Sequence, residues 1–173
     1  MVSELIEERA RTLAEVMHME QKYGDRPYTY HLKSVVLVLR EHGVRDEELI
    51  AGAWLHDIVE DTPASIADIE KLFGNRVATI VDLVTDPPGK NRKERKKLAY
   101  RRISTSSDAV VVKLADRIAN IRESILNENE SLTKMYRSED NSFFEMFTLA
   151  GFNDVNPLVK TYNNLINTID KSL

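Results

Sequence analysis

The sequence has no cysteine among its 173 residues. That absence excludes disulfide bonds, thiolate nucleophiles and cysteine-ligated zinc or iron–sulfur sites, and it fits a reducing compartment. No apolar run approaches the roughly 20 residues that a membrane-spanning helix requires. The first residues, MVSELIEERARTLAEV, are acidic and amphipathic, unlike a signal peptide. Neither a GxxxxGK phosphate loop nor a GxSxG elbow is present, which argues against ATP-coupled and serine-based chemistry. We therefore expect a cytoplasmic protein with no membrane partner.

The charge of the chain is unevenly distributed. The formal net charge is −4, yet residues 90–102 (KNRKERKKLAYRR) contain eight lysine or arginine residues and only one glutamate. A basic strip on an otherwise acidic protein argues against wholesale nucleic-acid binding. The strip is better sized for a small polyanion such as a nucleotide phosphate, although a solvated helix face has the same pattern.

Helical periodicity runs through nearly the whole chain, including the valine-rich segments VATIVDLV and AVVVKLA. With 42% apolar and 30% charged residues, the chain is expected to form one all-α domain of eight or nine helices over residues 1–173. Asp46 and Ser65 are expected N-caps, and Ser107 or Asp108 is expected to cap the helix that follows the basic strip. The expected helices comprise the basic strip together with residues 3–20, 29–42, 47–61, 66–73, 75–85, 109–126, 138–149 and 157–171.

Four residues with metal-ligand side chains recur inside apolar helical segments. His31 opens the second expected helix, the pair His56 and Asp57 lies in AGAWLHDIVEDT, and Asp116 lies in VVVKLADRIAN. Ionisable groups in apolar surroundings are costly unless they are paired, and a bound metal ion is one such partner. Two imidazoles and two carboxylates suit a borderline-to-hard divalent ion such as Mn²⁺ or Fe²⁺, with Zn²⁺ less favoured.

Glu60 and Asp61 follow the His56–Asp57 pair by one helical turn. Because an α-helix advances about 100° per residue, they are expected on a face next to that pair. Acidic residues at a helix C-terminus oppose the helix dipole, so their placement favours a functional role over a structural one. We expect them to orient or deprotonate an attacking water.

The order of these segments resembles the HD-domain metal-dependent phosphohydrolase superfamily. PYTYH, WLHDIVEDT, LFGNRVATIVDLVTD and VVKLADRIANIRE follow the order and spacing of the hydrolase domain of RelA/SpoT proteins. The length is similar to that of the stand-alone small alarmone hydrolases of the SpoT-homologue type. The similarity covers about residues 10–125 and leaves 126–173 as a helical C-terminal extension. HDIVEDT and KLADRIANIR are specific motifs, whereas a lone His-Asp pair carries almost no information.

This resemblance implies a Mn²⁺-dependent pyrophosphohydrolase that removes the 3′-diphosphate from guanosine 3′,5′-bis(diphosphate). By motif position it assigns the four metal ligands named above and places Glu60 and Asp61 where the family's acidic pair activates water. The partner is then a small nucleotide rather than a nucleic acid, and a homodimer is left open. The substrate-binding residues that it implies are Lys22, Tyr23, Lys90, Lys93 and Asn120.

The chain also departs from the family pattern. His31 is followed by Leu32 where the family has proline, and Lys22 and Tyr23 stand where the family has a basic pair. These departures leave an alternative function open, that of a related HD phosphohydrolase acting on a deoxynucleotide or a phosphorylated dinucleotide cofactor. A third hypothesis, a binding module that keeps the fold without the chemistry, is disfavoured because all the ligand types and the acidic pair are present.

Overall fold

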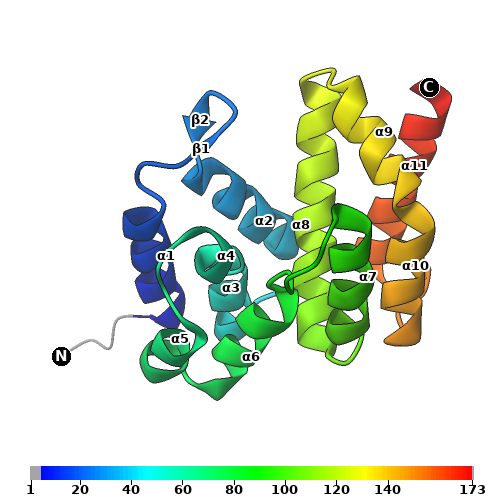
Figure 1. Ribbon diagram of the computed structural model, residues 1–173. Helices are drawn as coiled ribbons and strands as arrows, with labels where there is room; N and C mark the ends of the chain where they lie inside the picture. Colours follow the sequence, from blue (N-terminus) through cyan, green and yellow to red (C-terminus); the bar gives the residue numbers. More distant parts are fainter. Residues whose placement is uncertain (1–4, 173) are drawn as a thin grey trace.

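The computed structural model describes residues 5–172, and helices dominate this part of the chain (Figure 1). The all-α prediction is confirmed, although the helices outnumber the eight or nine expected and a small hairpin lies among them. The expected start of the first helix, at residue 3, lies outside the described residues. Within residues 5–172 no helix has both the length and the apolar character that crossing a membrane requires. In chain order the elements are α1 (Ile6–Met17), β1 (Lys22–Tyr23), β2 (Arg26–Pro27), α2 (Thr29–Glu41), α3 (Glu47–Trp54), α4 (Ile58–Asp61), α5 (Ile66–Phe73), α6 (Asn75–Val84), α7 (Arg92–Ile103), α8 (Ser107–Leu126), α9 (Glu130–Ser138), α10 (Asp140–Leu149) and α11 (Pro157–Ser172).

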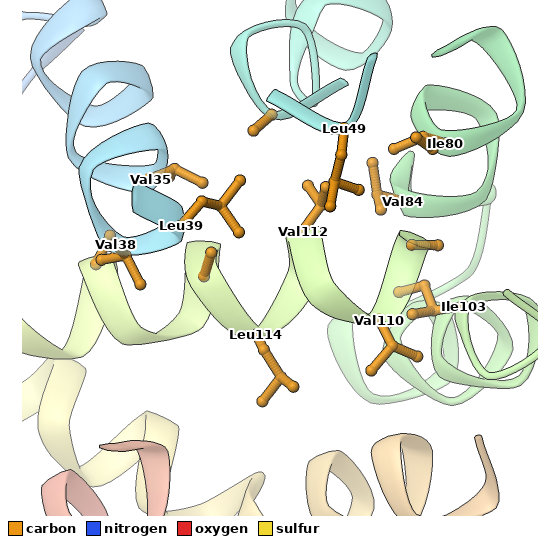
Figure 2. Packing of buried hydrophobic residues seen from close by; sticks show 14 of the residues in the cluster. Val35, Val38, Leu39, Leu49, Ile80, Val84, Ile103, Val110, Val112 and Leu114 are labelled. Atoms are coloured by element: carbon orange, nitrogen blue, oxygen red, sulfur yellow. The ribbon is translucent and has the colours of Figure 1, made fainter. Parts of the chain in front are cut away.

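Helix α8 is the central column of the fold. α2, α3 and α6 pack against it from one side, and α9 and α11 cover it from the other (Figure 1). Because both sides are covered, polar residues in the middle of α8 are buried along with its apolar ones. Figure 2 shows how buried side chains from several helices meet at this column, namely Val35, Val38 and Leu39 of α2, Leu49 of α3, Ile80 and Val84 of α6, Ile103 of α7, and Val110, Val112 and Leu114 of α8.

The helix starts follow local capping rules, with one correction. Asp46 accepts a hydrogen bond from the backbone N–H of Leu49, at 3.0 Å, as its expected cap role requires. Ser65 forms the expected cap of α5 as part of a capping box. The cap of α8 is Ser106 rather than Ser107 or Asp108, which lie inside the first turn. The expected cap position is therefore wrong by one or two residues.

The C-terminal third also differs from expectation. The helix expected over residues 138–149 is present as α10, which begins at Asp140, but α9, Glu130–Ser138, is an additional helix that was not expected. The side chain of Asn129 caps α9 by accepting from the backbone N–H of Leu132 at 3.1 Å. Asparagine is among the strongest N-cap residues, so this start had a signal in the sequence.

Gly52 lies at a close approach of α3 to α6. A Cβ atom at this position would stand 2.8 Å from Cγ2 of Ile80, closer than real Cβ contacts. We expect Gly52→Ala to lower the free energy of unfolding by about 1–3 kcal/mol, as overpacked core substitutions do, even though alanine is the better helix former. Urea unfolding would measure the change. Adding Ile80→Leu, which lacks Cγ2, should recover part of the loss, and a Gly52→Ala variant as stable as the wild type would contradict the close packing.

Candidate active site

The segment expected as one helix over residues 47–61 is divided, so this expectation is wrong. α3 ends before residues 55–57, which form a turn, and the single-turn α4 follows. Nδ1 of His56 lies 2.7 Å from the backbone oxygen of Ala53, an interaction that holds the imidazole against the end of α3. The turn presents His56 and Asp57 together, whereas a continuous helix would direct neighbouring side chains about 100° apart.

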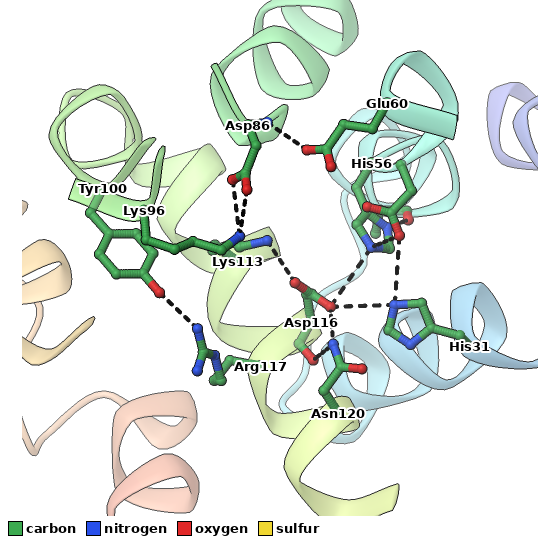
Figure 3. A network of polar contacts seen from close by, with 12 residues as sticks. His31, His56, Glu60, Asp86, Lys96, Tyr100, Lys113, Asp116, Arg117 and Asn120 are labelled. Atoms are coloured by element: carbon green, nitrogen blue, oxygen red, sulfur yellow. Dashed lines mark hydrogen bonds and ion pairs between the residues drawn. The ribbon is translucent and has the colours of Figure 1, made fainter. Parts of the chain in front are cut away.

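Two other helices complete a cluster around this turn. His31 in the first turn of α2 and Asp116 in the middle of α8 both point toward it (Figure 3). Nε2 of His31 lies 3.3 Å from Oδ1 of Asp116 and 3.8 Å from Oδ2 of Asp57. Nε2 of His56 lies 3.0 Å from Oδ2 of Asp57 and 3.8 Å from Oδ1 of Asp116. The structure therefore brings the four residues expected as metal ligands together, and ligand atoms of three of them, His31, His56 and Asp116, lie within 4.8 Å of one another.

The cluster is buried, and its charges depend on one another. The exposed fractions of His31, His56 and Asp116 are 3%, 1% and 7%. Burial by itself lowers the pKa of His56, but the carboxylates of Asp57 and Asp116 outweigh burial and raise that pKa to about 9. Burial by itself raises the pKa of Asp116, but the Lys113 ammonium and the two imidazoles outweigh burial and hold that pKa well below its usual range. The carboxylates of Asp57 and Asp116 thus favour a positive charge between them, which a divalent metal ion would provide.

The residues present fit a divalent metal ion. Nδ1 of His56 is occupied by the backbone oxygen of Ala53, so its other ring nitrogen is the one directed at the cluster. That nitrogen, Nε2, is buried, and apart from its 3.0 Å ion-pair contact with Asp57 it has no hydrogen-bond partner within residues 5–172. An imidazole fixed through one nitrogen with the other turned inward is typical of metal-ligating histidine. The set of imidazole and carboxylate donors suits a borderline-to-hard ion.

Side chains around the cluster hold both carboxylates in place. The hydroxyl of Tyr28 donates to Oδ2 of Asp57 at 2.5 Å. Nζ of Lys113 donates to Oδ2 of Asp116 at 2.8 Å. Charge-assisted hydrogen bonds of this kind are stronger than neutral ones, so they restrict where the carboxylate oxygens point. Sequence analysis missed the contact of Tyr28, although the residue is part of the PYTYH motif.

Tyr23 and Asn120, both expected to bind substrate, lie at the site and contact each other. Nδ2 of Asn120 donates to Oδ1 of Asp116 at 2.5 Å, and its Oδ1 accepts from the hydroxyl of Tyr23 at 2.7 Å. The ring of Tyr23 stacks on His31 with a centroid separation of 4.9 Å. The hairpin that carries Tyr23 is therefore joined to the histidine–aspartate cluster through both α2 and α8.

A cavity of about 370 Å³ opens beside the cluster and is rich in positive charge. Its wall includes His31, Asp57 and Asp116 and four cationic side chains, those of Arg92, Lys96, Lys113 and Arg117. Each cation has a carboxylate partner, such as Asp86 for Lys96 at 2.8 Å. A cavity with metal-ligand groups at one side and fixed cations at another suits a phosphorylated ligand.

The cations in this wall differ from those expected. Lys22, Lys90 and Lys93 are exposed and do not line the cavity. Lys96, which is not among the expected substrate-binding residues, is largely buried and does line it. The phase of α7 explains the difference, because its buried residues, Ala99, Tyr100 and Ile103, continue the stripe of Arg92 and Lys96 at helical spacing.

A second cavity, of about 600 Å³, adjoins the first. The two cavities share Tyr23, Asn120, Leu132 and Tyr136 as wall residues. The wall of the second cavity also includes Arg26, whose guanidinium lies 4.2 Å from the ring centroid of a neighbouring tyrosine, Tyr30. The two cavities therefore extend from the histidine–aspartate cluster to a larger end whose wall combines aromatic, amide and charged side chains.

The structure separates the two expected catalytic carboxylates. Glu60 lines the 370 Å³ cavity, and its Oε1 accepts a hydrogen bond from the backbone N–H of Asp86 at 2.5 Å. Burial raises the pKa of Glu60 above its usual value. Asp61 is not among the wall residues, and its Oδ2 instead accepts from Nε2 of Gln21 at 2.8 Å. Of this pair, Glu60 is the one placed to contact a ligand in the cavity.

Comparison with known proteins identifies the family behind this arrangement. Residues 10–146, which include the histidine–aspartate cluster, match the HD domain. The chain belongs to the HD domain family. The matched region of this HD protein extends through α9 into α10, beyond the end near residue 125 that the motifs indicate.

Several relatives of this HD protein are named for hydrolysis of guanosine-3′,5′-bis(diphosphate) or (p)ppGpp. Guanosine-3′,5′-bis(diphosphate) 3′-pyrophosphohydrolase MESH1 of Drosophila melanogaster is 38% identical over 127 residues, which cover 70% of this chain and 71% of that protein. The bifunctional (p)ppGpp synthase/hydrolase SpoT of Escherichia coli is 35% identical over 110 residues, or 60% of this chain and 16% of that protein. A solved structure described as a metazoan ortholog of SpoT that hydrolyzes ppGpp matches with a TM-score of 0.81 at 29% identity, covering 97% of both chains. The resemblance to small alarmone hydrolases is thereby confirmed.

Proposed function

We propose that this HD protein is a Mn²⁺-dependent pyrophosphohydrolase that removes the 3′-diphosphate of guanosine 3′,5′-bis(diphosphate). The observation that carries the proposal is the junction of the buried His–His–Asp cluster with a cavity lined by fixed cations. A metal-ligand cluster alone serves many reactions, but cations beside it favour a phosphate ester as substrate. Relatives whose names state this activity support the choice of nucleotide.

The four residues of the cluster, His31, His56, Asp57 and Asp116, would hold the ion. A divalent ion held there supplies Lewis acidity toward a phosphoryl oxygen and increases the acidity of water. Tyr28 and Lys113 keep the carboxylates oriented through the hydrogen bonds already described.

Glu60 would act as the general base. It would accept a proton from the water that attacks the phosphorus bonded to the 3′-oxygen. As the bond between that phosphorus and the 3′-oxygen breaks, the 3′-oxygen takes up a proton from solvent and leaves as the 3′-hydroxyl of GDP. The products are pyrophosphate and GDP. A raised pKa makes this carboxylate a better proton acceptor near neutral pH than an exposed glutamate. Arg92 and Lys96 would face the oxygens of the departing diphosphate.

The nucleoside would occupy the adjoining 600 Å³ cavity. Tyr23 and Asn120 lie where the two cavities meet, so they would contact the ribose side of the substrate. Arg26 over the ring of Tyr30 gives the wall of this cavity a flat cationic face, which suits stacking of a nucleobase.

A product assay tests this function directly. The protein is stripped of metal, refilled with Mn²⁺, and offered guanosine 3′,5′-bis(diphosphate) beside a panel of deoxynucleotides and phosphorylated dinucleotide cofactors. The expected result is pyrophosphate and GDP from the alarmone, with at least tenfold preference over the panel. A tenfold preference for another nucleotide would instead establish the related HD phosphohydrolase. Full metal occupancy without turnover of any compound would refute both.

Lys96 provides a more local test of the cation-lined wall. Replacing it by methionine removes a charge-assisted contact to a phosphate, which is worth about 1.5–3 kcal/mol, so kcat/KM should fall roughly 10- to 100-fold. Initial rates over a substrate range would measure the loss. Lys97→Met is the matched control, because Lys97 is the next residue of α7 and does not line this cavity. Equal losses in the two variants would contradict a contact at Lys96.

A further inference from the structure

His18 is a buried histidine that the reaction described above does not use. It follows α1 as its C-cap and is 1% exposed. The sequence analysis gives it no role. Nδ1 of His18 lies 2.7 Å from Oε1 of Gln21, while Nε2 is buried with no hydrogen-bond partner within residues 5–172. A buried polar atom without a hydrogen-bond partner lowers the stability of the folded state, so this placement requires an explanation.

The hydrogen bonds of His18 lead to α4 through Gln21. Nε2 of Gln21 donates to Oδ2 of Asp61 at 2.8 Å. An ionised carboxylate accepts hydrogen bonds only, so the amide must present its nitrogen to Asp61 and its oxygen to His18. The oxygen in turn requires that Nδ1 of His18 carry the proton. In this hydrogen-bond relay of three residues, Asp61 thus determines the orientation of the Gln21 amide and the tautomer of the His18 imidazole.

The hydrogen-bond relay from His18 ends on α4, the element that carries Glu60. α4 is a single turn, Ile58–Asp61, and Asp61 is its last residue. Glu60 is the preceding residue, and its side chain lines the cavity. So short a helix has few internal hydrogen bonds to fix its direction, and a tether at its last residue restricts the position of its neighbour.

The same imidazole also supports the other side of the histidine–aspartate turn. Its ring stacks on Tyr28, with centroids 4.9 Å apart and an interplanar angle of 24°. Tyr28 is the residue whose hydroxyl donates to Asp57. One face of the His18 ring therefore supports the Tyr28 contact with Asp57, and its Nδ1 supports the Gln21 contact with Asp61.

We propose that His18 and Gln21 are positioning residues that hold α4, and with it Glu60, in the productive geometry. Neither residue contacts the expected metal ligands or lines the cavity. Their hydrogen bonds act through Asp61, and the ring of His18 acts separately through Tyr28. This inference rests on the proposed function, because it assigns a consequence to the placement of Glu60. It predicts an effect on turnover rather than on substrate binding.

Substitutions at His18 separate its two contacts. His18→Phe keeps a ring against Tyr28 but removes the donor, whereas His18→Asn keeps a nitrogen donor at the same number of bonds from Cβ. His18→Phe should lower kcat about tenfold, with KM within twofold and metal content unchanged, and His18→Asn should recover most of the loss. Gln21→Met, at a partly exposed position, should reproduce the effect of His18→Phe without altering the buried ring.

The decisive comparison is made in an Asp61→Ala background. If the hydrogen bonds of His18 and Gln21 act through Asp61, adding His18→Phe to the Asp61→Ala variant should lower kcat no further. His42→Phe is the matched control, since His42 caps α2 and bonds to Thr161 of α11, away from the cavity. It should lower stability but leave kcat within twofold. A loss in His18→Phe that persists undiminished in the Asp61→Ala background, or that His42→Phe equals, would overturn the proposal.

A measurement that does not depend on activity separates this inference from the proposed function. Nitrogen-15 NMR of histidine-labelled wild type should show His18 as the Nδ1–H tautomer, assigned by its disappearance in His18→Phe. The Nε2–H tautomer would overturn the hydrogen-bond relay, whatever the substrate. If the protein shows the Nδ1–H tautomer but does not hydrolyse the alarmone, the proposed function is refuted while the hydrogen-bond relay stands.

Discussion

Replacing His56 by alanine should remove bound metal and activity together. Its Nε2 is the buried nitrogen directed into the ligand cluster, and its Nδ1 is held by the backbone oxygen of Ala53. Because a divalent ion supplies several kcal/mol of transition-state stabilisation, we expect kcat to fall more than about 10³-fold. Elemental analysis of the purified variant should show less than a tenth of the wild-type metal content.

Thermal unfolding gives an independent reading of the same prediction. Metal at 100 times its Kd stabilises the native state by about 2.7 kcal/mol, which corresponds to a rise in Tm of roughly 5–10 °C for a chain of this size. We expect this rise in the wild type and its absence in His56→Ala. Asp61→Asn is the control, because its side chain lies outside the cluster and should leave the rise intact. Wild-type metal content in His56→Ala would show that the ion, if any, sits elsewhere.

The helices and the ligand cluster were largely accessible from sequence because both depend on short-range patterns. Asp46 caps α3 through its own side chain, and apolar spacing fixed the helical character of the valine-rich segments. His31 and Asp116 were identifiable because charge or imidazole in an otherwise apolar helix requires a partner. No local pattern could show that those partners are each other, since α2 and α8 meet only in the packed fold.

One error and one unmet expectation have local causes. Helical spacing from residue 47 to residue 61 concealed the turn at 55–57, where the side chain of His56 contacts the backbone oxygen of Ala53. In the basic strip, the resemblance implied Lys90 and Lys93 as substrate-binding residues, yet neither lines the cavity. Had the apolar positions been used to set the helix phase, Arg92 and Lys96 would have been favoured instead.

The contacts made by the hairpin segment could not have been predicted. Gln21 reaches Asp61 across 40 positions of sequence, and Tyr28 reaches Asp57 across 29. Each contact depends on how residues 18–28 fold back over α4, which composition and periodicity do not specify. Sequence analysis expected both Glu60 and Asp61 to act on water, but their surroundings differ: Glu60 lines the 370 Å³ cavity, whereas Asp61 contacts Gln21 outside it.

Replacing Glu60 by glutamine should retain the metal and slow the reaction about 10²- to 10⁴-fold, the range for loss of a general base. Glutamine preserves the shape of the side chain and an oxygen for the backbone N–H of Asp86, but it cannot take a proton from water. KM should change little, because the charge of the cation-lined wall is untouched. Single-turnover kinetics with guanosine 3′,5′-bis(diphosphate) would measure the chemical step itself.

The pH profile distinguishes Glu60 from Asp61. A base must be ionised to act, and burial raises the pKa of Glu60 above its ordinary value of 4.5. The rate should therefore decline as pH falls through a value above 4.5, and that limb should disappear in Glu60→Gln. Asp61→Asn should keep the limb and lose less activity, because asparagine still offers an oxygen to Gln21. If Asp61→Asn instead lost the acid limb while Glu60→Gln kept it, Asp61 would be the base, and α4 would have to turn that side chain into the cavity during the reaction.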